Sequence, residues 1–275
     1  MTQALTLASR PRTLTGQAAL ALSVRIWFAV ALVGQWAFVA YILGFYGPST
    51  MSGHFQAWSR NHMLLKGYVA GDTAGNLAFA AHVLVAASVT FIGALQLIPS
   101  LRRRAPGLHR WSGRIFLAAA TIASVSGLYM VWVRGAAQNP TSSLNISLNA
   151  LLILLFAALA WRAAIQRRFE GHQHWAMLLY LAVSGGWFYR AGVFAWMVLA
   201  HGAGTTDAGD SPVDYALGYG CYLGPLGVYE LYRLARRGSE GGRWAMAGGL
   251  ATATAIILVG VAGVAWAGWR PLLLA

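Results

Sequence analysis

The chain has 275 residues, of which 58% are hydrophobic and 10% charged, and its mean hydropathy is +0.56. Because a soluble domain carries roughly 25% charged residues, this composition predicts an integral membrane protein. The net charge of +13 comes from basic residues in short loops between apolar runs, which indicates membrane topology rather than nucleic-acid binding. The single cysteine, Cys221, excludes an intramolecular disulfide and any cysteine-rich metal or iron–sulfur site.

The N-terminal region predicts a short tail and then a membrane span. Residues 1 to about 20 are poor in acids and contain Arg10 and Arg12, so we expect a cytoplasmic tail. The first apolar run, about 26–46, has the ~20 residues that a helix needs to cross the hydrocarbon core. This run is too long for the hydrophobic region of a signal peptide, and no small-residue cleavage site follows it.

The longest loop, residues 47–75, is expected on the external side. Within it Met51, Phe55 and Trp58 recur at helical spacing and would share one side of a short helix. We expect that helix to lie in the membrane interface, with these side chains toward the lipid.

Six further apolar runs predict membrane-spanning helices. They are about 77–98, 111–133, 144–164, 175–200, 215–234 and 245–269. The run at 215–234 is interrupted by Gly218, Gly220 and Gly224-Pro225, so its backbone is expected to be flexible. The fold class is therefore all-α: residues 1–275 form a single polytopic transmembrane bundle with seven spans.

A loop rich in arginine gives the orientation of this bundle. Five arginines lie within residues 102–114, and Pro99 and Pro106 bracket a tight connection between two spans. With seven spans, fifteen of the twenty basic residues fall on the side of this loop. The positive-inside rule makes that side cytoplasmic, with the N-terminus cytoplasmic and the C-terminus external.

Polar residues inside the predicted spans indicate a ligand site. Arg190 lies about 22 Å from the inner end of its span, and His82 lies ~9 Å below the outer surface, so both occupy the outer third. Asn145 and Asn149 reach the same level. These four residues would bind an anion or a carbonyl group, such as a carboxylate, a haem propionate or a quinone. In a second interpretation, Arg190 extends to the interface and His82 bonds a backbone carbonyl.

A second group of polar residues lies near the cytoplasmic end. His109 begins the third predicted span, His174 precedes the fifth, and Glu230 lies about one turn inside the sixth. Imidazole is a ligand for haem iron, and a carboxylate can orient such a ring. In the alternative interpretation, these histidines only cap helix ends. HExxH, Walker A and GxSxG motifs are absent, no metal site is predicted, and only seven acidic residues exist, so hydrolytic enzymes are poor candidates.

Two sequence blocks resemble those of a known family. The first contains His82, then GALQL at 93–97, then HRWSGR at 109–114; the second contains HWAM at 174–177 and then Arg190. In this order they resemble a bacterial family of predicted membrane proteins with a domain of unknown function (number 2306). The second block departs from the family pattern, since Ala176 separates the tryptophan from the methionine.

This resemblance covers residues 77–200 or so and implies a multi-pass bundle in the bacterial inner membrane. It directs attention to His82, His109, His174 and Arg190, and it implies no particular activity.

Two functional hypotheses follow. In the first, the protein is a redox protein that holds haem b or a quinone among its spans. Two histidine ligands must lie at one depth, a condition that His109 and His174 meet near the surface, whereas His82 has no histidine partner in the outer half. In the second, a non-catalytic bundle transports or senses a small ligand in an intramembrane polar cavity. The lipid bilayer is the one partner predicted by both; enzymatic activity and oligomeric state stay open.

Overall fold

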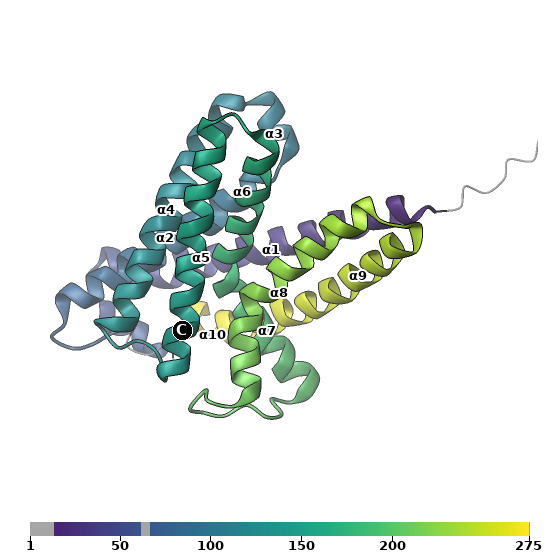
Figure 1. The fold of residues 1–275 in the computed structure, drawn as a ribbon. Coiled ribbons are helices and arrows are strands. Elements are labelled where there is room, and N and C mark those ends of the chain that lie inside the picture. Colours follow the sequence, from purple (N-terminus) through teal and green to yellow (C-terminus); the bar gives the residue numbers. More distant parts are fainter. Residues whose placement is uncertain (1–13, 62–66, 275) are drawn as a thin grey trace, which may run out of the picture.

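The computed structural model describes residues 14–61 and 67–274, and all regular structure in these ranges is helical (Figure 1). Most of the predicted cytoplasmic tail, residues 1–13, lies outside the described residues. In chain order the helices are α1 (Gly16–Met51), a 3₁₀ helix (Phe55–Arg60), α2 (Thr73–Gln96), α3 (Pro99–Arg104), α4 (Pro106–Trp132), α5 (Pro140–Ile165), α6 (Phe169–Val183), α7 (Gly185–Ala200), α8 (Pro212–Arg237), α9 (Glu240–Gly263), a π-helical turn (Val264–Trp269) and α10 (Arg270–Leu274).

Capping residues and prolines determine where several helices begin. The Asp72 carboxylate accepts a hydrogen bond from the backbone N–H of Gly75 at 2.8 Å and caps α2. Pro99 and Pro106 each stand at the first position of a helix, where the missing N–H costs nothing. The predicted tight connection between these prolines is therefore the short helix α3, and α4 begins five residues before the predicted third span.

Two groups of helices diverge in Figure 1. Helices α2, α4, α5 and α6 run alongside one another, with the α3 segment and the α5–α6 turn at the same end. Helices α1, α8 and α9 extend in a second direction, and α1 packs against both α9 and α2. Helix α7 packs against α8 and α9, while contacts of α1 with α2 and of α8 with α5 and α6 link the two groups.

Five helical segments among the described residues are long and apolar enough to cross a membrane. They are Gly16–Met51, Thr73–Gln96, Pro106–Trp132, Pro140–Ile165 and the continuous run Glu240–Leu274. The all-helical membrane architecture is thus confirmed, whereas the number seven is not. The predicted fifth span is divided at Ser184 into α6 and α7, which have 15 and 16 residues. The predicted sixth span corresponds to α8, which is more polar and rich in glycine.

A buried polar network explains the division at Ser184. Its hydroxyl donates to the carbonyl of Tyr180 at 2.8 Å and accepts from the Gln35 amide at 3.0 Å. The Tyr180 hydroxyl donates in turn to Gln35 Oε1 at 2.9 Å. Because Gly185 and Gly186 follow directly, the helix can bend here while α1 satisfies the polar groups.

In the described part of the predicted outer loop, the short helix is the 3₁₀ helix Phe55–Arg60. Its Trp58 is only 1% exposed, and the indole N–H donates to Ser49 Oγ at 2.7 Å. Trp58 therefore packs into the protein core, and not toward lipid as its spacing had indicated. Helix α1 extends to Met51 and includes Pro48, so the first helix is longer than the predicted span at both ends.

An ion pair joins the start of α2 to the segment that follows α4. Arg134 Nε donates to Asp72 Oδ2 at 3.0 Å, and its Nη2 donates to Asn76 Oδ1 at 2.6 Å. The backbone N–H of Gly75, with the Arg134 guanidinium, holds the pKa of Asp72 below its usual value. This buried arginine fixes the two helices whose facing sides line the cavity described next.

Candidate functional site

A cavity of about 650 Å³ lies among α1, α2, α4, α5, α7 and α8. The four residues predicted to bind a ligand, His82, Asn145, Asn149 and Arg190, all line it, although they come from three different helices. The structure therefore brings these side chains together around one cavity. A cavity of this size is in the range of small-molecule sites.

Arg190, on α7, provides the positive charge of the cavity. Its Nη1 donates to the Gly186 carbonyl one turn earlier at 2.7 Å, and its guanidinium lies 5.1 Å from the centre of the Phe38 ring. The half-buried guanidinium forms no ion pair with any described carboxylate. An arginine side chain has five N–H donors, and Arg190 uses one of them in the bond to Gly186. Most of its donors are therefore available to a ligand.

The acidic residues around the start of α8 bond to groups other than Arg190. Asp214 also lines the cavity, but it accepts hydrogen bonds from Ser211 Oγ at 2.8 Å and from Thr206 Oγ1 at 3.0 Å in the capping box of α8. Asp210 accepts from Thr206 Oγ1 at 2.8 Å. Asp207 forms no ion pair with Arg190 either. The cation thus lacks a protein counterion in the described chain.

His82, on α2, is held by a hydrogen bond to Ser126. Its Nδ1 lies 2.8 Å from Ser126 Oγ, and that hydroxyl donates to the Ile122 carbonyl at 2.7 Å. Since the single hydroxyl proton is already used, Ser126 accepts from Nδ1–H, and Nε2 keeps its lone pair. His82 can therefore accept a hydrogen bond from a ligand through Nε2.

Two asparagines form a polar ladder on α5. Asn145 and Asn149 stand one turn apart, ~6 Å along the helix, and the buried Oδ1 atom of each has no hydrogen-bond partner. A Cβ at Gly218 would lie 2.7 Å from Asn145 Nδ2, and a Cβ at Gly185 would lie 3.1 Å from Asn149 Nδ2. The glycines on α8 and α7 therefore make room for these amides. An unsatisfied buried amide costs about 1–3 kcal/mol, which favours a ligand that bonds to it.

Sequence reasoning missed two polar groups of the cavity wall. Ser124 and Trp187 are 4% and 2% exposed, and neither the Ser124 hydroxyl nor the Trp187 indole N–H has a hydrogen-bond partner. Trp187 stands three residues before Arg190 and therefore on the same face of α7. That spacing was the available signal for Trp187, whereas a lone serine within an apolar run gives none.

The residues predicted to bind a cofactor at the inner end lie apart from this cavity. His174 Nδ1 lies 3.7 Å from Glu230 Oε1, its ring stacks on Tyr229, and Glu230 also pairs with Arg233 at 2.7 Å. His109 has a buried Nδ1 without a partner, and Arg102 and His172 lie near it. The structure thus joins His174 to Glu230 and places His109 in different surroundings. In residues 14–61 and 67–274 no cluster of three or more histidine, cysteine or acidic side chains could hold a metal ion.

Comparisons with known proteins give one family match and one distant relative. A family model described as "Predicted membrane protein (DUF2306)" matches residues 79–229, just over half of the chain. Ava biosynthesis cluster protein G of Aspergillus versicolor is 32% identical over 75 residues, which are 27% of this chain and 22% of the fungal protein. This match thus spans about a fifth of that relative. No solved structure matches. The family region includes His82, Asn145, Asn149 and Arg190 and ends just before Glu230.

Proposed function

The chain belongs to the DUF2306 family of predicted membrane proteins, and from this premise we propose that it binds a small molecule with an anionic or carbonyl head group in its intramembrane cavity. The observation that carries this proposal is the convergence of Arg190, His82, Asn145 and Asn149 on one volume of about 650 Å³. A guanidinium inside a membrane bundle needs a partner, and here no described protein group provides the countercharge.

The wall chemistry defines the ligand further. Arg190 and Trp187 offer N–H donors, His82 Nε2 is an acceptor, and each asparagine amide can donate or accept. Much of the remaining wall is aromatic or aliphatic. A compact oxygen-bearing head on an apolar body fits this pattern, so a quinone is the candidate in the redox class and an amphiphilic carboxylate in the transport or sensing class.

The same geometry favours an organic ligand over a haem with two histidine ligands. Among the described residues that line the cavity, His82 is the one histidine, while His174 lies beside Glu230 and His109 lies near Arg102 and His172. Haem b among the spans therefore ranks below a quinone or a carboxylate.

Ligand retention by purified protein tests this function. The protein is purified in mild detergent, its absorption spectrum is recorded, and an organic extract is analysed by mass spectrometry. We expect about one quinone or acidic amphiphile per chain. Asn149→Leu removes an amide and fills part of the cavity, so retention should fall about tenfold. Ser88→Leu is the matched control, since Ser88 is exposed on α2 and bonds only to its own helix.

Two results would count against the proposal. One is an extract with the same content in wild type and Asn149→Leu. The other is a Soret band at one haem per chain that disappears in His109→Ala or His174→Ala, which would establish a bis-histidine haem instead.

For topology we propose seven crossings, with α6 and α7 forming one crossing that is interrupted at Ser184, and α8 forming another. The basic residues at 102–114, 162–168 and 233–243 would then lie in the cytoplasm, and the membrane would be the bacterial inner membrane. The N-terminus would be cytoplasmic and the C-terminus external.

Reporter fusions test this topology. Alkaline phosphatase and green fluorescent protein fused after residues 104, 168 and 240 should report the cytoplasm, and fusions after 60, 138 and 208 should report the outside. If the fusion after 168 reports the outside, the seven-span arrangement is wrong.

A further inference from the structure

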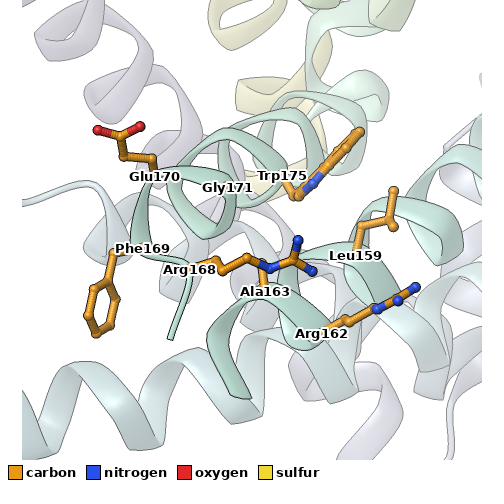
Figure 2. Close-up of a pocket in the computed structure, with 8 residues that line it drawn as sticks. All are labelled: Leu159, Arg162, Ala163, Arg168, Phe169, Glu170, Gly171 and Trp175. Atoms are coloured by element: carbon orange, nitrogen blue, oxygen red, sulfur yellow. The ribbon is translucent and has the colours of Figure 1, made fainter. Parts of the chain in front are cut away.

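A second concave site lies at the turn between α5 and α6 and is independent of the cavity (Figure 2). It is a groove of about 660 Å³. It is lined by Leu159, Arg162, Ala163, Arg168, Phe169, Glu170, Gly171 and Trp175. Arg167 adopts a positive φ of 55°, which allows the chain to reverse sharply between the two helices.

Two arginines and one glutamate line this groove, so its net charge is positive. In Figure 2 the guanidinium groups of Arg162 and Arg168 lie on the same side of the turn, whereas Glu170 points away from them. Both arginines are exposed, and neither forms an ion pair with a described carboxylate. Arg168 donates one hydrogen bond to Gln166 Oε1, so most of the N–H groups of the pair are available.

The start of α6 adds to this positive potential. Arg168 is the N-cap residue of α6, and no side chain caps the first turn. The first N–H groups and the positive end of the helix dipole therefore favour an anion at this helix end. Together with two guanidinium groups they match the oxygens of a phosphate.

Apolar groups complete the groove. Leu159, Ala163 and Trp175 line it beside the arginines, and Ile165 in the last turn of α5 is 62% exposed. Tryptophan is typical of the membrane–water interface, where its ring contacts the lipid head-group region. A free phosphate would use the arginines alone, whereas a phospholipid would also contact these apolar side chains.

We propose that this groove binds the phosphate of an anionic phospholipid head group. Arg162 and Arg168 bond to the phosphate oxygens, the first turn of α6 provides further positive potential, and Trp175 with Leu159 contacts the glycerol and upper acyl region. Anionic lipids are favoured over zwitterionic ones because the two guanidinium groups have no counterion in the described protein.

Native mass spectrometry of the full chain released from detergent micelles tests this proposal. Wild type is titrated with phosphatidylglycerol or phosphatidylcholine, and the bound fractions are compared with those of Arg162→Gln/Arg168→Gln. We expect wild type to prefer phosphatidylglycerol, and the double variant to bind it about thirtyfold more weakly. The matched control is Arg102→Gln/Arg103→Gln, which removes the same charge from exposed positions on α3 at the same end of the helices.

The outcomes distinguish a specific lipid site in the groove from nonspecific electrostatic attraction to the protein. Loss in Arg162→Gln/Arg168→Gln with near wild-type binding in the α3 control supports the proposal. Equal loss in both double variants would overturn it, because binding would then follow net charge alone. Inorganic phosphate at millimolar concentration should not displace the lipid; displacement would identify a free-anion site instead. An unchanged thermal midpoint of both variants in size-exclusion chromatography excludes misfolding as the cause.

Discussion

Gly260→Leu is expected to disrupt the bundle more than any other single substitution considered for this chain. A Cβ at Gly260 would lie 1.9 Å from the carbonyl oxygen of Ala191, so α9 and α7 meet backbone to backbone at this point. A backbone carbonyl cannot rotate away as a side chain can, and the helices would have to separate. Small residues at such crossings provide the close approach that stabilises membrane bundles. We expect a loss of about 3 kcal/mol or more.

Fluorescence-detected size-exclusion chromatography of a green fluorescent protein fusion measures this effect through the thermal midpoint. Gly249→Leu is the matched control, since a Cβ at Gly249 in the same helix α9 has no atom within 4 Å. That variant should elute like wild type, while Gly260→Leu should aggregate or melt far earlier. Equal midpoints for the two variants would show that α7 and α9 are not in contact as described. Because Ala191 adjoins Arg190, this crossing also positions the cavity cation.

The sequence predicts the helices better than their ends, and α1 shows why. The predicted first span begins near residue 26, whereas α1 begins at Gly16. In the added segment Ala19 and Leu20 are buried against Ala247 and Leu250 of α9. The extra turns are stabilised by a helix more than two hundred residues later. Local hydrophobicity contains no information on such a contact.

The prediction of the number of spans was limited in a similar way, by a contact that lies far away in the sequence. The run at 175–200 has the length and composition of a span, and Ser184 alone does not predict a break. The break depends on Gln35 of α1, which accepts from Tyr180 and donates to Ser184. A tertiary hydrogen-bond partner thus decides whether this serine interrupts the helix.

The residues of the candidate cavity were easier to predict than the grouping of His109, His174 and Glu230. Helical rise alone gave similar depths for Arg190, His82, Asn145 and Asn149, and these residues do line one cavity. Depth does not give lateral position, however. His109 and His174 were also predicted at one depth, yet His174 faces Glu230 on α8 and His109 lies near Arg102 and His172. Which helices are neighbours is a property of the whole packing arrangement.

Arg190→Leu is expected to abolish ligand retention without destabilising the fold. The guanidinium remains charged at any physiological pH, and its described protein contacts are the Gly186 carbonyl and the Phe38 ring. Removing an unpaired charge from inside the bundle should leave the thermal midpoint of the ligand-free protein unchanged or raise it. The ligand would lose its charge-assisted hydrogen bonds, which lowers affinity tenfold to about a hundredfold.

Arg190→Lys tests whether ligand retention depends on the positive charge alone or also on the planar geometry of the guanidinium. Lysine keeps the positive charge but loses the planar set of donors that can bond a carboxylate or carbonyl while still reaching Gly186. We therefore expect retention in the lysine variant to fall about tenfold by mass spectrometry of extracts. The control is Arg270→Lys, because Arg270 also lies over an aromatic ring, 4.3 Å from the centre of Trp266, but does not line the cavity. Full retention in both Arg190 variants would mean that Arg190 only extends toward the interface, and the cavity would lose its proposed anchor. Retention lost in both, with a stable fold, requires the ligand itself to supply the counterion of Arg190, since Asp214, which also lines the cavity, already caps α8.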